Sequence, residues 1–233
     1  MLVLATATAT EAVTLSSALD DSAETEIDGV VGHRGRLGGV EVAVHDLGVG
    51  RAAVAFTLSR LLRDPPAAVL LLSAGPALDG SGLGEGDLAV ATAETYADLG
   101  VATDEGLLDA ASLGLRLAPG APGQTFLTDP RLADVLSEAP ARPGPFLSAD
   151  ALAGSESLAA QRTGRWGSAL AETREGAAAA HACLLESVPY AHLRAIEGSL
   201  TAPAAPGGLP QGLVAAATHA LGGIVDALDH PFS

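Results

Sequence analysis

Short apolar runs alternate along the chain with stretches of helical spacing, a pattern typical of proteins that mix strands with helices. Residues 1–7 form an apolar run suited to a buried strand, and residues 8–19 have helical spacing. A second helical run covers residues 51–63, two prolines end it, and an apolar strand over residues 67–73 follows. The order strand, helix, strand indicates a crossover unit and therefore a parallel or mixed sheet.

The rest of the chain continues this α/β pattern. No internal repeat or break in composition divides it, so we expect a single domain over residues 1–233. We predict strands at residues 29–33, 40–46, 87–90, 93–96, 145–149 and 189–196, helices at 129–138, 155–163, 174–186 and 210–228, and loops at 20–28, 75–86, 100–123 and 202–208.

The charge balance excludes several kinds of partner and chemistry. The chain has 28 acidic and 12 basic residues, a formal charge of −16, so it should repel the phosphates of nucleic acids and anionic membrane surfaces. All the basic residues are arginine, and without lysine there is no Schiff base, no pyridoxal cofactor and no Walker-type phosphate loop. Aromatic residues make up only 3%, so Ala, Val and Leu must fill the core.

The chain has one cysteine, Cys183, which excludes an internal disulfide and argues against a structural zinc site. Its place in an Ala-rich predicted helix indicates a core residue rather than a nucleophile. The N-terminal residues lack the basic and long apolar regions of a signal peptide, and the longest apolar run, residues 67–72, is too short to span a membrane. We therefore expect a cytoplasmic protein.

Three groups of polar residues follow predicted strands, where open α/β sheets usually bind ligands. They are Thr6, Thr8, Thr10 and Glu11; Glu172, Arg174 and Glu175; and Arg194 with Glu197. Each group alone has an ordinary explanation, because a carboxylate in the first turn of a helix commonly serves the helix dipole.

Other chemistries have weaker support in the sequence. The histidines have no paired spacing of the kind that binds a metal, so we expect no metal site; they are His33, His45, His181, His192, His219 and His230. No Gly-x-Ser-x-Gly elbow is present, which argues against a serine-triad hydrolase. The segment from Gly48 to Gly50 lacks the third glycine of a dinucleotide fingerprint, so we interpret it as a tight turn.

Taken in order, several segments resemble the nucleoside phosphorylase and nucleosidase superfamily. Residues 172–181 (ETREGAAAAH) resemble its Glu-x-Met-Glu-Gly/Ala-Ala motif, and residues 188–196 (VPYAHLRAI) resemble its Pro-Phe-x-x-x-Arg-x-Ile strand. Residues 48–55 and 86–90 match its Gly-x-Gly helix start and its Gly-Asp-x-Val-Val strand. The resemblance spans the chain from the first strand to about Ile196 and implies a three-layer α/β/α fold with a central mixed sheet.

Within this superfamily the chain resembles the futalosine hydrolases, on residues 97–107 (ADLGVATDEGL) and 144–148 (GPFLS). Enzymes of that family hydrolyse the N-glycosidic bond of futalosine, releasing hypoxanthine and dehypoxanthine futalosine in a route to menaquinone. The resemblance thus implies a purine nucleoside as the substrate, no cofactor, and association into a homo-oligomer.

The resemblance also implies residue roles. Glu11 corresponds to the general base that activates water, and Glu175 to the glutamate that binds the ribose hydroxyls. Arg194 corresponds to the arginine that places the water and the ribose. Leu152 and Ala153 correspond to the segment that lies against the base, and Phe146 and Gly75 are further expected contacts of the substrate.

Water is the expected nucleophile, because the segment from Thr8 to Glu11 lacks the Gly-Asp-Pro of phosphorylases and no arginine precedes Arg34. Three positions depart from the family pattern. Gly198 occupies the position of the catalytic acid, so neighbouring Glu197 is the candidate to protonate the base. Arg174 replaces a methionine, and the loop after the central strand has lost glycines. A diverged subunit that binds ligand or serves assembly, with weak or no catalysis, is therefore the alternative.

Overall fold

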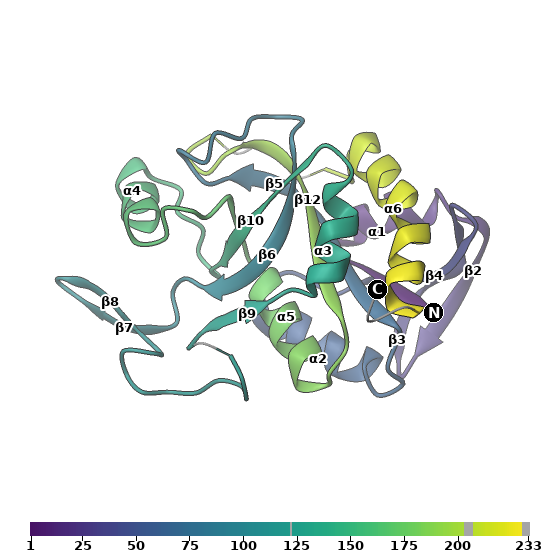
Figure 1. Cartoon of the computed structure of the whole chain (residues 1–233), viewed down its shortest axis with the longest axis horizontal. Coiled ribbons are helices and arrows are strands. Elements are labelled where there is room, and N and C mark those ends of the chain that lie inside the picture. Colours follow the sequence, from purple (N-terminus) through teal and green to yellow (C-terminus); the bar gives the residue numbers. More distant parts are fainter. Residues whose placement is uncertain (122, 203–206, 230–233) are drawn as a thin grey trace.

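In the computed structural model, which describes residues 1–121, 123–202 and 207–229, a mixed ten-stranded sheet forms the middle layer of the molecule (Figure 1). The strand order is β11-β10-β6-β12-β5-β1-β4-β3-β2, with β9 added beside β6. β1 pairs in parallel with β4 and β5, whereas β12 runs parallel to β5 and antiparallel to β6. The expected fold, a three-layer α/β/α structure with a central mixed sheet, is confirmed.

The strands of this sheet and of a small separate hairpin vary from three to ten residues in length. They are β1 (Leu2–Thr6), β2 (Asp20–Ile27), β3 (Val30–Leu37), β4 (Val40–Asp46), β5 (Ala68–Ala77), β6 (Leu88–Tyr96), β7 (Gly100–Thr103), β8 (Gly106–Asp109), β9 (Thr125–Leu127), β10 (Ala141–Ser148), β11 (Ala171–Thr173) and β12 (Tyr190–Ser199). The helices are α1 (Ala9–Ser16), α2 (Arg51–Leu61), α3 (Pro130–Ser137), α4 (Glu156–Arg165), α5 (Gly176–Leu185) and α6 (Gln211–Asp229).

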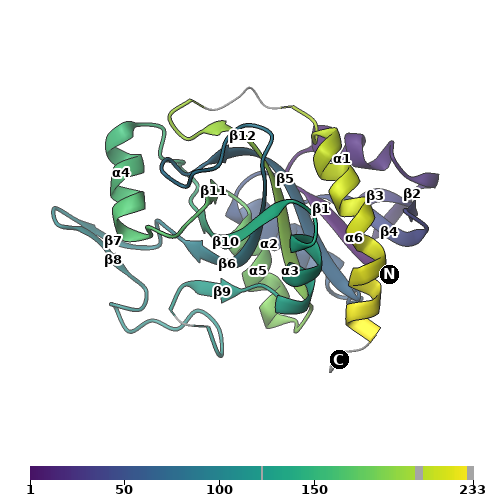
Figure 2. The ribbon, with the colours of Figure 1, turned by 45° about the horizontal axis from the view of Figure 1, so that its top comes forward.

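Helices cover both faces of the sheet, as Figures 1 and 2 show. Alternate residues of β1 point to opposite faces, as the two-residue period of a strand requires: Leu2 and Leu4 pack in one core, Val3 and Ala5 in the other. The first core also contains side chains of α1, α3 and α6, and the second those of α2 and α5. Every residue of β1 is buried, so this strand lies at the centre of both cores.

Local sequence signals explain where several helices begin. Thr8 forms a capping box with Glu11 at the start of α1, and Asp129 followed by Pro130 starts α3 as predicted. α5 is rich in alanine and is buried along Gly176–Ala180, because small side chains let the helix approach the sheet closely.

Five segments differ from the sequence prediction. Residues 20–28 were expected as a loop but form β2, a polar edge strand held by pairing with β3. The expected loop at 100–123 contains the β7–β8 hairpin. The two short strands predicted at 87–90 and 93–96 are one strand, β6. The short strands β9 and β11 were not predicted, because three residues carry too little pattern.

Two other expectations fall partly on residues outside the described part of the chain. His230 lies there, and so do residues 203–206 of the loop expected at 202–208. Within the described part, no helix combines the length and the apolar character needed to cross a bilayer.

Candidate active site

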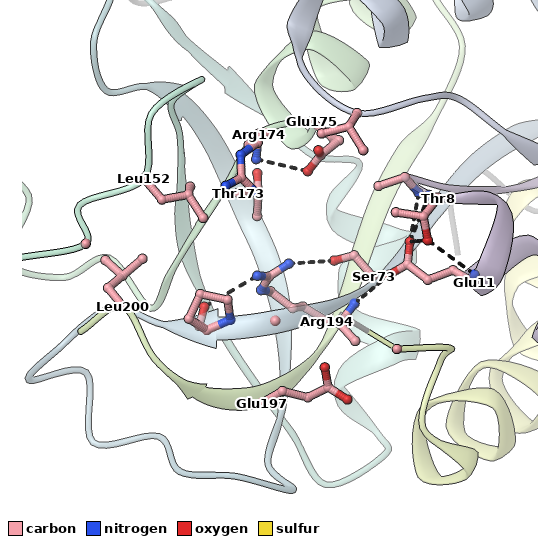
Figure 3. Close-up of a pocket in the computed structure, with 17 residues that line it drawn as sticks. Thr8, Glu11, Ser73, Leu152, Thr173, Arg174, Glu175, Arg194, Glu197 and Leu200 are labelled. Carbon is pink, nitrogen blue, oxygen red and sulfur yellow. Dashed lines mark hydrogen bonds between the residues drawn. The ribbon is translucent and has the colours of Figure 1, made fainter. Parts of the chain in front are cut away.

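A cavity of about 620 Å³ opens where the carboxyl ends of β1, β5, β11 and β12 come together (Figure 3). This is the edge at which open α/β sheets bind ligands. The loops before α2 and after β10 complete its wall. Its lining comprises Ala7, Thr8, Glu11, Val49, Ser73, Ala74, Gly75, Pro76, Leu152, Gly154, Thr173, Arg174, Glu175, Arg194, Glu197, Leu200 and Gly207.

Glu11 lies in the first turn of α1 and is only 4% exposed. One carboxylate oxygen, Oε2, accepts hydrogen bonds from the backbone N–H groups of Ala7 (3.1 Å) and Thr8 (3.0 Å) and from the Thr8 hydroxyl. The other, Oε1, accepts from the Ala74 N–H at 3.1 Å, across the cavity floor on β5. Burial raises the pKa of Glu11 above its usual range, although these hydrogen bonds oppose the shift.

Glu175 directly precedes α5 and closes the opposite wall. Its carboxylate accepts a hydrogen bond from the Arg174 N–H at 2.9 Å and another from the Gly50 N–H at 3.4 Å. The second contact joins the turn before α2 to the start of α5, 125 positions apart in the sequence. A buried carboxylate held by two backbone donors keeps a fixed position, as a group that must grip a diol requires.

Arg194 crosses the cavity floor from β12 and is 4% exposed. Its NH1 donates to the Ser73 hydroxyl at 2.9 Å, and its NH2 reaches the carbonyls of Pro76 and Glu172 at 3.5 Å (Figure 3). Burial lowers the pKa of the guanidinium below its usual value, and the carboxylates around the cavity, Glu11 and Glu175 among them, oppose this.

Gly75 lies against this arginine. Its φ of +150° and a Cβ that would collide with the Arg194 guanidinium explain why glycine occupies the position. The predicted contacts Glu11, Glu175, Arg194 and Gly75 therefore line a single cavity.

The segment expected to lie against the base is only partly in the cavity. Leu152 lines it, but Ala153 is 1% exposed, and its N–H donates to the buried Glu172 carboxylate at 2.9 Å instead of facing a ligand. Phe146, an expected substrate contact, is fully buried in the core, where its ring lies edge-on to that of His192 at 5.1 Å. Phe146 and Ala153 thus support the cavity wall without lining it.

The positions that depart from the family pattern lie at the cavity. Glu197 lines its edge, and Figure 3 shows the Glu197 carboxylate apart from the cluster of Arg194, Ser73 and Glu11. It also borders a second hollow, of about 920 Å³, next to α6. Gly198 has a φ of +84°, which lets β12 kink before Ser199 pairs with β5 again. Arg174 is exposed and forms no side-chain ion pair with any described residue.

Several polar residues that the sequence did not single out belong to the site. Ser73, on β5, lines the cavity and contacts both Arg194 and the buried His192 ring, whose other nitrogen contacts Glu94. Thr173 lines it as well. The one available signal was the alternation of His192 and Arg194 on a single strand, which directs both side chains to the same face.

The comparisons with known proteins agree with this architecture. The chain matches the model of the phosphorylase superfamily over residues 2–226. It is 38% identical to a futalosine hydrolase of Streptomyces coelicolor over 112 residues, a match that spans 48% of this chain and 45% of that protein. It is 28% identical to a 5′-methylthioadenosine/S-adenosylhomocysteine nucleosidase of Haemophilus influenzae over 201 residues, 82% of each chain.

Solved structures show the same fold. The nucleosidase from Neisseria meningitidis, in complex with methylthio-immucillin-A, superimposes with a TM-score of 0.77 at 18% identity, over 97% of this chain and 98% of that one. The family model covers nearly the whole chain, and the strand order and the cavity at the carboxyl ends of the strands fit it. The protein therefore belongs to the phosphorylase superfamily.

Proposed function

We propose that the protein is a nucleosidase that hydrolyses the N-glycosidic bond of a purine nucleoside, with futalosine as the favoured substrate. The observation that carries the proposal is the convergence of Glu11, Glu175 and Arg194 on one cavity at the carboxyl ends of the strands. Hydrolysis of such a bond needs a base for water, a partner for the ribose cation and hydroxyls, and a proton for the leaving purine.

The geometry suits the first two needs. Glu11 is fixed by hydrogen bonds from α1 and β5, so a water beside it meets an acceptor in a constant position. Glu175, on the opposite wall, offers a carboxylate to the ribose hydroxyls. Arg194 lies between them on the floor, where its guanidinium is placed to orient the reacting water.

Two observations support futalosine among purine nucleosides. The sequence match to the Streptomyces futalosine hydrolase has higher identity than the longer match to the methylthioadenosine nucleosidase. Arg174, exposed on the cavity wall, favours a nucleoside whose substituent near the ribose is negatively charged, because a guanidinium pairs well with carboxylate or phosphate.

The alternative is a diverged protein that binds a nucleoside-like ligand, or serves assembly, without turnover. The observation that favours it is Gly198, which places no acid where the family pattern has one. Glu197 is the neighbouring candidate for that role. It lies at the edge of the cavity, apart from Arg194 and Glu11.

The test is release of the purine base from futalosine, aminodeoxyfutalosine, inosine and methylthioadenosine, each with and without phosphate. We expect release from futalosine that does not depend on phosphate. Glu175→Gln should raise KM and lower kcat, whereas Glu156→Gln, an exposed carboxylate on α4, should match the wild type. Tight binding of futalosine without any release of hypoxanthine would support the diverged protein instead, and neither binding nor release would contradict both.

A further inference from the structure

A row of hydrogen-bonded side chains crosses three neighbouring strands beneath the cavity floor. Glu94 lies on β6, His192 and Arg194 on β12 in the middle, and Ser73 on β5. The Glu94 carboxylate contacts His192 Nδ1 at 2.6 Å, and His192 Nε2 contacts the Ser73 hydroxyl at 2.7 Å. The same hydroxyl accepts a hydrogen bond from Arg194 Nη1 at 2.9 Å. The row therefore connects a fully buried pair to the guanidinium at the floor of the cavity.

Arg194 depends on Ser73 for its orientation. The hydrogen bond to Ser73 Oγ is the shortest that its guanidinium makes with a described residue, and the carbonyls of Pro76 and Glu172 lie 3.5 Å from Nη2, beyond the usual range. Nε is buried and has no partner within the described part of the chain. Since a flexible side chain with one good hydrogen bond follows its acceptor, the position of Ser73 Oγ sets that of the guanidinium.

His192 holds the Ser73 hydroxyl in turn. A serine side chain has three staggered rotamers, and contacts on two sides of its oxygen select one of them. The contact does not depend on the tautomer of the ring, because Oγ can accept from a protonated Nε2 or donate to a bare one while it accepts from Arg194. The ring is fixed by Glu94 at Nδ1 and by the edge-on ring of Phe146 at 5.1 Å. The position of the hydroxyl therefore depends on the buried pair.

Cohesion of the sheet does not by itself explain a carboxylate and an imidazole at this depth. Glu94 and His192 are both 0% exposed, and taking an ionisable pair out of water costs free energy that apolar side chains of similar size do not cost. An apolar pair would therefore join β6 to β12 at least as well, which leaves the orientation of Ser73 as the role that needs polar groups.

The residue after Ser73 holds the other group that meets the water. Ala74 donates its N–H to Glu11 Oε1 at 3.1 Å, while Ser73 Oγ accepts from Arg194. Two consecutive residues of β5 thus fix the base and the guanidinium relative to each other. A shift of Ser73 would change the direction of the guanidinium relative to the base, at the place where the proposed mechanism puts the water.

We propose that Glu94 and His192 are positioning residues: through Ser73 they hold the Arg194 guanidinium where it can orient the reacting water. This inference rests on the proposed nucleosidase function. Both residues lie behind the lining of the cavity, so their effect is on the geometry of the groups that line it. A misplacement of about 1 Å in such a group can slow a reaction on the order of 100-fold.

The competing explanation is a pair that only joins β6 to β12. Glu94→Leu/His192→Leu separates the two explanations, because replacing both residues leaves no charge of this pair buried without its partner. The double variant removes the contact at Ser73 Oγ and keeps an apolar pair of similar volume between the strands. A pair that only joins strands predicts wild-type kcat in the folded variant, whereas a positioning pair predicts a loss of kcat.

We expect kcat for futalosine to fall about 10- to 100-fold in this double variant, and KM to stay within about threefold because Glu175 and the cavity walls are unchanged. Glu94→Gln should keep kcat within about threefold, since its amide contacts His192 Nδ1 in either orientation and the row stays in place. Far-UV circular dichroism and urea unfolding check that the variants fold. If the double variant does not fold, Glu94→Gln/His192→Leu removes the same contact to Ser73 with a polar side chain kept on β6, and the same loss of kcat is expected.

Thr95→Val is the matched control and should keep the kcat of the wild type. Thr95 is the buried neighbour of Glu94 on β6, and its hydroxyl pairs with that of Thr125 outside the row. Wild-type kcat in a folded double variant, or an equal loss of kcat in Glu94→Gln, would overturn the positioning role and leave the nucleosidase intact. A wild-type protein that cleaves none of the nucleosides tested would contradict the proposed function, and this inference with it.

Discussion

Glu11 shows how one side chain can serve the fold and the reaction together. Four hydrogen bonds hold its carboxylate, three of them from the residues that begin α1. This capping arrangement holds Oε2 and explains a glutamate at this position in a helix. The fourth bond, from Ala74 on β5, is not needed for capping, and it directs the carboxylate to the cavity floor.

The activity should therefore depend on pH through Glu11. The base must be ionised to accept a proton from water, and burial raises its pKa above the usual 4.5. As the pH falls through that raised pKa, Glu11 takes up a proton and kcat/KM should fall, so the acid limb should lie above pH 4.5. Glu11→Gln should lower kcat at least about 100-fold at pH values above this pKa, and the deficit should shrink at lower pH, where the wild-type base is itself protonated. Glu24→Gln, on the exposed strand β2, is the control, and an unchanged pH profile in Glu11→Gln would contradict this role.

His45 at the end of β4 gives a second prediction at this scale, for stability. The ring is fully buried, neither ring nitrogen has a hydrogen-bond partner among the described residues, and burial lowers its pKa below the usual 6.5. The unfolded chain then binds the proton more readily than the folded one, so stability present above pH 6.5 is lost as the pH falls toward the lowered pKa.

Urea unfolding of the wild type and of His45→Gln at pH 7 and pH 5.5 measures this effect. We expect the wild type to lose up to about 1.4 kcal/mol more per pH unit than the variant. His219→Gln removes an exposed histidine and should keep the pH dependence of the wild type. Parallel losses in the wild type and in His45→Gln would show that His45 does not titrate on unfolding.

Among the elements, α4 is joined to the cavity loop by a buried ion pair. Arg162 on this helix pairs with Glu172, which is fully buried on β11, and Glu172 also accepts the hydrogen bond from Ala153. The pair thus ties α4 to the loop that carries Leu152 into the cavity. Arg165, three positions later, pairs with the more exposed Asp109 instead.

Arg162→Met should therefore destabilise the protein by about 3 kcal/mol at neutral pH, because it leaves a buried carboxylate without its counter-ion. Burial already raises the pKa of Glu172, and removing Arg162 should raise it further, so the deficit should shrink as the pH falls and Glu172 takes up a proton. Arg165→Met breaks a half-exposed pair and should cost less than about 1 kcal/mol. Equal unfolding midpoints of the two variants would contradict the distinction.

The sequence predicted most of these elements and failed where pairing decides the structure. Apolar runs such as residues 67–73 and the Asp129–Pro130 start of α3 are local signals. β2 has no such signal, because both of its faces are polar and only its hydrogen bonds to β3 make it a strand. The buried contact between Glu94 and His192 is further from prediction, because the two residues lie 98 positions apart and meet through the order of β6 and β12.

For the molecule as a whole, the dominant electrostatic feature is its net charge of −16. Self-repulsion between carboxylates destabilises the compact state, and dissolved ions screen it over about 10 Å at 0.1 M. We expect the melting temperature to rise between 10 mM and 300 mM NaCl, measured by circular dichroism at pH 7.5. KCl should act equally, and a rise with one of the two salts alone would indicate a bound ion instead of screening.

The labelling rate of the chain's single cysteine should measure how fast α5 opens at the site. Cys183 is a residue of α5 and is fully buried in the core, and burial raises the pKa of its thiol to about 12, so a thiol reagent cannot reach a reactive thiolate in the closed protein. Labelling should therefore proceed only as fast as α5 lifts from the sheet. The same movement would withdraw Glu175 from one wall and uncover Glu94, which packs under Gly176. A ligand that holds the cavity closed would slow the labelling of Cys183. The rate of mass increase at this one thiol would therefore report occupancy of the site without any turnover.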